Sequence, residues 1–230
     1  MPIKEETQIP TPFEGFTTTD FAIFEIEGFA NRMPKVREQI KPKLTQIGQA
    51  LTESLSEIVG ERLYTHVAQH LRRTVNPPQE TWVAFSCAQR AYKPFVHLRS
   101  TIRAEKVRIL VFVEDYADEK IAFAESLHKN AKKLAKHFAQ NPEIRAYEIL
   151  NEKEEPLFGK SLTSAKIEAF AERMQRVKGQ HAIFGIEVSR DNSIVQDGEM
   201  LLKVIQEATQ KLKPLYALVP HKAVVGKSKK

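Results

Sequence analysis

The sequence contains one cysteine, one tryptophan and no long apolar run. With Cys87 alone no intrachain disulfide can form, which is typical of proteins kept in a reducing compartment. The longest fully apolar run, Ile109 to Val113, is far shorter than the roughly 20 residues that a spanning helix needs. The first residues are polar and broken by proline, without the apolar core of a signal peptide. We therefore expect a cytoplasmic protein without a membrane partner.

Glycine-rich nucleotide motifs are also missing. Neither G-x-G-x-x-G nor G-x-x-x-x-G-K-[ST] occurs, which argues against Rossmann-type dinucleotide sites and P-loop sites. No internal period is present, so repeat architectures are excluded. An apolar fraction of 42% and a charged fraction of 28% are ordinary for a globular protein.

What the sequence has in excess is arginine in its middle third. Between Arg62 and Arg108 there are nine basic residues, seven of them arginine, and two acidic ones. Such a run is often a solvated face that pairs with acidic helices. The planar guanidinium also binds carboxylate or phosphate in a bidentate way that lysine cannot, so the choice of arginine favours an anion site.

The helical and strand-like patterns predict an α+β fold. We expect a single domain over residues 17–219, preceded by a flexible arm (1–16) and followed by a basic disordered tail (220–230). The strand patterns predict a roughly five-stranded mixed sheet that begins with an antiparallel meander, with helices packed mainly on one face. The strands are expected at 82–89, 95–103, 107–115, 144–150 and 182–190, and the main helices at 30–59, 118–140, after Thr163 and after Asp197.

Prolines and a glycine mark breaks in the expected helices. Pro34 and Pro42 lie inside the apolar stripe of residues 30–59, so we expect two helices or one with a break near Lys41. Gly60 is expected to end this region as a C-cap, and Pro214 to stop or bend the last helix.

Strand alternation predicts a polar hollow. In the segment 95–103 the odd-numbered side chains are mostly polar, and in the segment before it one face is mostly small. If both faces point away from the core, small residues lie opposite long polar ones and leave a concavity. The hollow is a hypothesis, because the sequence does not set the register. Its lining would be Trp82, Ala84, Ser86, Ala88, His97, Arg99, Thr101 and Arg103.

Three histidines are candidates for chemistry. On a helix, the spacing of His66 and His70 would place both rings on one face, as in two-histidine metal sites. No glutamate follows His66 as in H-E-x-x-H and no third ligand is identified, so we expect no metal. His66 and His97 are candidates for a general acid or base. The alternative for His97 is a structural ring that hydrogen-bonds to a backbone carbonyl.

The central motif resembles a known family. The stretch from Tyr64 to Pro78 (YTHVAQHLRRTVNPP), continued by TWVAF at 81–85, looks like the hallmark segment of the YktB-like family of uncharacterised bacterial proteins. DFAIF at 20–24 and IKPKL at 40–44 are similar to that family's N-terminal part, and the likeness covers residues 16–218. It implies a cytosolic α+β domain of unknown function, and it provides no catalytic residue, substrate or cofactor.

Three functions are consistent with these patterns. The first is a binding module for a small anionic or phosphorylated ligand, and the second is an enzyme that acts on a phosphate or carboxylate substrate with a histidine as acid or base. The third is a nucleic-acid-binding or partner-docking module, although few aromatic residues are available for stacking. The cofactor and the oligomeric state are unknown. The expected ligand-binding residues are His66, His70, Arg72, Arg73, Asn76, Trp82, Arg90, His97 and Arg99.

Overall fold

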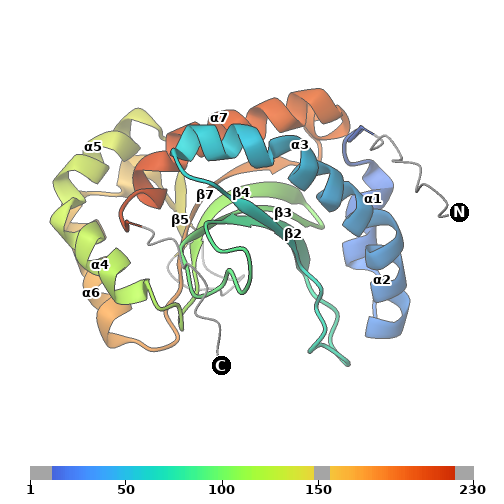
Figure 1. Ribbon diagram of the computed structural model, residues 1–230, viewed down its shortest axis with the longest axis horizontal. Helices are drawn as coiled ribbons and strands as arrows, with labels where there is room; N and C mark the ends of the chain where they lie inside the picture. The colour runs from blue at the N-terminus through green and yellow to red at the C-terminus, as the bar shows by residue number, and fades with distance from the viewer. Residues whose placement is uncertain (1–11, 148–155, 221–230) are drawn as a thin grey trace, which may run out of the picture.

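One antiparallel sheet organises the chain. The computed structural model describes residues 12–147 and 156–220, and within these ranges seven strands form the order β1-β2-β3-β4-β7-β5-β6 (Figure 1). Every pairing is antiparallel, and the last strand of the chain, β7, lies between β4 and β5. The strands are β1 (Tyr64–Val67), β2 (Glu80–Ser86), β3 (His97–Arg103), β4 (Lys106–Val113), β5 (Arg145–Tyr147), β6 (Leu157–Phe158) and β7 (Ala182–Ser189).

Helices cover one face of this sheet. Helix α3 packs against β1 and β2, and α7 packs against β3, β4 and β7. Helices α4, α5 and α6 place Phe123, Phe138 and Phe170 around Phe184 of β7. Figure 1 shows α3 and α7 above the convex side of the arched sheet and α4 to α6 at its left end. The helices are α1 (Thr18–Ala22), α2 (Phe29–Lys35), α3 (Lys41–Val59), α4 (Lys120–Lys129), α5 (Ala131–Gln140), α6 (Ser164–Arg176) and α7 (Gly198–Tyr216), with short segments η1 (Ile23–Glu25), η2 (Val36–Ile40), η3 (Gly159–Ser161) and η4 (Ser193–Gln196).

Side-chain alternation decides which face the helices cover. Phe85 on β2, Leu98 on β3 and Val111 on β4 are paired across the strands and buried in the main core. Because successive side chains in a strand point to opposite faces, the polar residues between these apolar positions lie on the other face. That face is the concave side of the sheet.

The helical region expected over residues 30–59 is confirmed, including its irregular middle. Helix α2 passes into the π-helical segment η2 and then into α3. Pro42 at the start of α3 lacks an amide hydrogen, and its ring excludes the regular position of a carbonyl one turn earlier, which accounts for a wider turn there. Gly60 adopts φ 87° and donates its N–H to the carbonyl of Ser56, as expected of a C-cap.

The α+β class, the meander and the one-sided helices are confirmed, and the differences are local. The sequence pattern misses β1 and β6. The sheet is antiparallel rather than mixed. Strands β4 and β5 run in the same direction, but β7 lies between them and is antiparallel to both. The helix expected over 118–140 is two helices that meet at Asn130, and α7 continues through Pro214 to Tyr216. None of the described helices is long and apolar enough to cross a membrane.

The N-terminal segment is packed from Phe13 onward. Phe13 and Phe16 are buried, and the amide of Phe16 donates to the carbonyl of Val195 (2.6 Å). Gly15 between them adopts φ 102°, and a Cβ there would lie 2.5 Å from the backbone of Gln196. The packed part therefore begins before residue 17, whereas positions 1–11 of the expected arm and 221–230 of the expected tail lie outside the described residues.

Substitution of Gly15 tests this docking. Gly15→Ala should lower the free energy of unfolding by about 1–3 kcal/mol, because an L-residue is strained at this φ and its Cβ would overlap backbone. The measurement is urea denaturation followed by circular dichroism. Gly179→Ala is the matched control, since no atom lies within 4 Å of a Cβ built there and no positive φ is involved. Equal losses in both variants would contradict the prediction.

Candidate functional site

The concave face carries the polar side chains of the central strands. It lies opposite α3 and α7, and the loop 87–96 between β2 and β3 runs beneath it (Figure 1). The register places Trp82, Thr101 and Arg108 in one row across three strands, which confirms the shared face that strand alternation predicts. The concave face, as used below, consists of His66, Trp82, Ala84, His97, Arg99, Thr101, Arg108, Leu110, Phe112, Tyr147, Ile183 and Glu187.

Arg99 is the centre of the first cluster on this face. Its side chain is 3% exposed, and it donates to Glu114 Oε1 (2.5 Å) and to His97 Nε2 (2.8 Å). The guanidinium carbon lies 4.4 Å from the ring centre of Trp82 and 3.6 Å from that of Phe112. A buried cation is tolerated only when it is paired and hydrogen-bonded, and aromatic faces add to its stabilisation.

His97 has no free ring nitrogen. A carbonyl can only accept, so Nδ1 carries the hydrogen that is donated to Phe95 O (2.7 Å). The Nε–H of Arg99 can only donate, so Nε2 of His97 is its acceptor. Burial, and then the charge of Arg99, lower the pKa of His97 well below its ordinary value. The ring is held neutral in one tautomer, which is the structural alternative considered for it.

Aromatic rings occupy the space over Ala84. Tyr92 of the loop 87–96 lies between the rings of His66 and His97, with centroid distances of 4.8 and 4.9 Å. Its hydroxyl accepts a hydrogen bond from Nε1 of Trp82 (2.9 Å). Ala84 itself is fully buried. The concavity expected at this small residue is therefore filled by side chains.

A third histidine, His181, lies between two carboxylates at the end of β4. Ligand atoms of Glu114, Asp115 and His181 are within 4.8 Å of one another, which is a spacing that a metal ion could bridge. The cations of Arg99 and Lys93 already face Glu114, at 2.5 and 3.8 Å, so a divalent ion would compete with them. Burial lowers the pKa of His181 although both carboxylates oppose that shift. The cluster resembles an acid–base group more than a metal centre.

A second charge network follows on β2, β4, β5 and β7. Arg108 is paired with Glu80, and Glu187 accepts hydrogen bonds from Tyr147, Arg145 and Lys106. Burial and Glu187 raise the pKa of the Tyr147 hydroxyl, which therefore stays protonated as a donor. Glu80 lies on β2, Arg108 on β4 and Glu187 on β7, so the network crosses the sheet.

Two buried polar atoms of this face have no hydrogen-bond partner among the described residues. They are Oγ1 of Thr101 and Nε of Arg108, in side chains that are directly paired between β3 and β4. Thr101 is 1% exposed and Arg108 is 4% exposed. Buried donors are nearly always satisfied by protein, water or ligand, so this pair marks a place where a further acceptor belongs.

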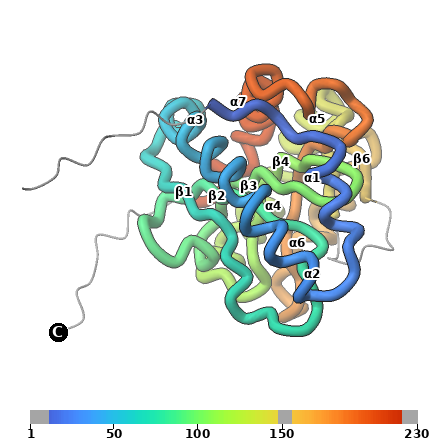
Figure 2. Tube along the Cα trace, turned by 90° about the vertical axis from the view of Figure 1, so that its right-hand side faces the viewer, coloured from blue at the N-terminus to red at the C-terminus, as the bar shows by residue number. Residues whose placement is uncertain are grey.

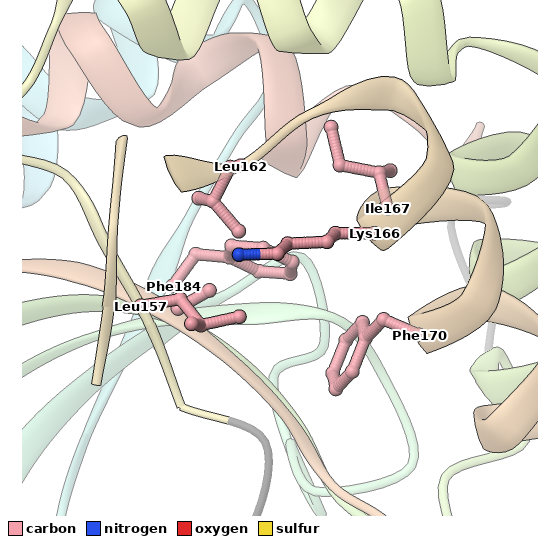
Figure 3. A pocket seen from close by; sticks show the side chains of 7 residues that line it. Leu157, Leu162, Lys166, Ile167, Phe170 and Phe184 are labelled. Carbon is pink, nitrogen blue, oxygen red and sulfur yellow. The ribbon is translucent and has the colours of Figure 1, made fainter. Parts of the chain in front are cut away.

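Another hollow opens between α6 and the β5–β6 end of the sheet. It has a volume of about 250 Å³, part of it open to solvent, and Figure 3 shows Lys166 reaching across it above Phe184. A lysine stem that covers apolar surface while its amine stays in water is an ordinary arrangement. Its lining is Ala146, Leu157, Leu162, Lys166, Ile167, Phe170 and Phe184.

Comparison with known proteins gives the family. The model of a family described as a domain of unknown function, DUF1054, matches residues 16–216. The chain belongs to the DUF1054 family. It is similar to a UPF0637 protein of Shouchella clausii (32% identical over 90% of this chain and 95% of the relative) and to one of Bacillus mycoides (32%, 88% and 96%). A UPF0637 protein of Bacillus velezensis is 30% identical, over 88% of this chain and 95% of its own length. The resemblance to a family of uncharacterised bacterial proteins is confirmed.

The DUF1054 domain brings together five of the nine residues expected to bind ligand. His66, Trp82, His97 and Arg99 belong to the first cluster, and the ring of His70 contacts Trp82 edge-on at 5.3 Å. His66 lies on β1 and His70 beyond it with φ 52°, so no helix places the two rings on one face. His66 Nε2 donates to Ala88 O (2.9 Å). The other four are exposed in the loops that flank β2: Arg72, Arg73, Asn76 and Arg90.

The strongest polar groups of the site were not among the expected residues. Glu114 and His181 come from strand ends, and Glu187 from the expected strand 182–190. The alternation of Ile183, Gly185 and Glu187 in the segment 182–190 could have placed Glu187 opposite the core. No comparable signal links Glu114 to Arg99.

Loss of the buried ion pair should be costly. Arg99→Gln should lower the free energy of unfolding by about 3–5 kcal/mol, because it leaves Glu114 buried without its main cation. Arg190→Gln is the matched control, since the Arg190–Glu25 pair is exposed and should contribute little to stability. Urea denaturation followed by circular dichroism measures both. A loss for Arg99→Gln no larger than the control would contradict this role.

Stability should fall as the pH drops below neutrality. The folded-state pKa values of His66, His70, His97 and His181 lie below the ordinary 6.5, mainly through burial, and that of His70 is about 4. A lowered pKa gives stability that is complete above pH 6.5 and is lost as the pH falls toward the folded-state value. Chemical denaturation between pH 7 and 5 should show this slope, reduced in His70→Gln. The same substitution at exposed His128 is the control, and an unchanged slope in His70→Gln would refute the assignment.

Proposed function

We propose that the DUF1054 domain binds a small ligand with carboxylate or phosphate oxygens on its concave face, between Thr101 and Arg108. The observation that carries this proposal is the adjacent pair of buried, unpartnered atoms, Thr101 Oγ1 and Arg108 Nε. An oxygen acceptor placed between them would satisfy both groups. Hydrogen bonds to a charged partner are the strong ones, which favours an anionic oxygen over a neutral one.

The charges around this pair support an anion. In the network of the described residues, the three cations of Arg108, Arg145 and Lys106 share the two carboxylates of Glu80 and Glu187. One positive charge is therefore in excess in this network, beside the buried Arg108 and with Lys106 and Arg145 partly exposed. A single negative charge on a ligand would be attracted there.

Aromatic side chains border the same place. Trp82 is the direct neighbour of Thr101 on β2, and the ring of Tyr147 lies 5.4 Å from the guanidinium carbon of Arg108. Apolar walls with a few fixed polar groups are the usual composition of small-molecule sites. Trp82 and Tyr92 are partly buried and already contact each other, so the concave face does not support a stacking platform for nucleic acid.

An enzymatic role would rest on His181 and not on His97. His181 keeps 17% of its side chain exposed, and its Nε2 lies 3.7 Å from Asp115 Oδ1. The amide of Asp115 donates to Nδ1 (3.2 Å), which fixes the hydrogen on Nε2. A histidine oriented in this way beside a carboxylate can accept or donate a proton.

Anion titrations of matched variants test the proposed site. We expect inorganic phosphate or succinate to change the fluorescence of Trp82, the only tryptophan, and to raise the melting temperature. Thr101→Val keeps the shape of the side chain and removes the hydroxyl, so it should weaken this binding about tenfold or more. Without anion, Thr101→Val should be as stable as the wild type or more so, because the lost hydroxyl has no partner.

Ser100→Ala is the control for this experiment. Ser100 is buried on the same strand but on the helix-covered face, so its loss should leave anion binding unchanged. Equal binding by wild type and Thr101→Val would overturn the proposal. So would a high-resolution map that shows one water between Thr101 and Arg108 in the presence of the anion.

A further inference from the structure

The segment between β1 and β2, residues 68–79, projects from the sheet as a narrow tip. Figure 1 shows its two legs reaching beyond the end of β2 at the lower right, and Figure 2 shows it at the lower edge of the molecule. The exposed end of this segment, residues 71–75, contributes no group to the proposed ligand site at Thr101 and Arg108, so an inference about it does not depend on that site.

Hydrogen bonds hold both legs of the tip segment. Ala68 N–H donates to Trp82 O (2.9 Å), and the His70 ring is bonded to Thr81 Oγ1 (3.0 Å). On the second leg, Arg32 NH1 donates to Pro78 O (3.0 Å). The two prolines at 77 and 78 restrict the backbone further. Both legs of the tip segment are thus anchored, one to β2 and the other to α2.

Two exposed aliphatic side chains lie at the end of the tip segment. The N–H of Arg73 bonds to the carbonyl of His70 and closes a turn whose middle residues are Leu71 and Arg72. Leu71 is 81% exposed and Val75 is 76% exposed, the two highest values among the large apolar residues that the structure describes. Apolar side chains gathered on a projecting end are typical of a contact surface.

The charge of the tip segment is entirely positive. Residues 68–79 contain Arg72 and Arg73 and no acidic residue. Neither arginine forms an ion pair within residues 12–147 and 156–220. The positive charges of Arg73, Lys41 and Lys93 each lower the pKa of His70, after the larger effect of burial, so all three act at the base of the tip.

We propose that the tip segment docks the domain reversibly on an anionic phospholipid surface. Leu71 and Val75 would enter the boundary between headgroups and acyl chains, and Arg72 and Arg73 would lie against the lipid phosphates. Aliphatic groups gain little from nucleic acid, where aromatic stacking and phosphate contacts dominate, whereas lipid accommodates both kinds of side chain. The sequence predicts no membrane partner because it lacks a spanning segment, but a surface contact requires none.

Vesicle co-sedimentation of the full chain tests this proposal. We expect binding to phosphatidylcholine vesicles that contain phosphatidylglycerol, loss of binding at high salt, and little binding to pure phosphatidylcholine. Leu71→Ser/Val75→Ser keeps every charge, and Arg72→Gln/Arg73→Gln keeps the aliphatic groups. Each double variant should lower the partition coefficient roughly tenfold or more. Thermal melts should match the wild type, since all four side chains are exposed.

Lys132→Gln/Lys133→Gln on α5 is the charge-matched control and should bind as the wild type, because these exposed lysines lie far from the tip segment in the chain and on another element. Three results would overturn the proposal: no binding to phosphatidylglycerol vesicles at low salt, equal loss in the α5 control, or binding that survives Leu71→Ser/Val75→Ser. Binding of a DNA or RNA oligonucleotide that depends on Arg72 and Arg73 but not on Leu71, without vesicle binding, would replace lipid by nucleic acid.

Discussion

The buried charge of Arg99 is the constraint on which the concave face depends. A guanidinium removed from water must be surrounded by acceptors and polarisable groups, and here these come from four different parts of the chain. His97 lies two residues away on β3, and Trp82 belongs to β2. Phe112 is on β4, and Glu114 follows the end of that strand. Tyr92, in the loop 87–96, holds Trp82 in place by accepting its Nε1 hydrogen bond. The position of each element is therefore tied to one charge.

The two faces of the sheet are stabilised by different interactions. On the convex side α3 and α7 bury aliphatic and aromatic rows, whereas on the concave side cations and carboxylates from neighbouring strands satisfy one another. A network of this kind is sensitive to geometry, since each buried polar group requires a partner. In such surroundings Thr101 Oγ1 and Arg108 Nε are informative, because no other buried side-chain nitrogen or oxygen among the described residues lacks a hydrogen-bond partner.

The sequence supports the local features of this fold more than its pairings. The caps at Thr163 and Asp197, the C-cap at Gly60 and the alternation in residues 97–103 follow from short-range rules, and the structure confirms them. The grouping of His66, Trp82, His97 and Arg99 follows partly from that alternation. The pairing of Arg145 with Glu187 joins residues far apart in the chain, and it depends on β7 entering between β4 and β5, which no local pattern indicates. For His66 and His70 a local pattern exists but is misleading, since residues with helical spacing lie in a strand and in the loop after it.

The place of β7 also affects how the chain can be assembled during synthesis. The first four strands are complete by Val113, yet the free edge of β4 receives its neighbour only when residues 182–189 have left the ribosome. That edge includes Ile109, Leu110 and Val111, and an unpaired apolar strand is a template for association between chains. The helices made in the interval, α4 to α6, place Phe123, Phe138 and Phe170 around Phe184, so their packing also waits for β7. The sheet is thus completed late, and the edge of β4 is open to pairing with another chain until β7 is inserted.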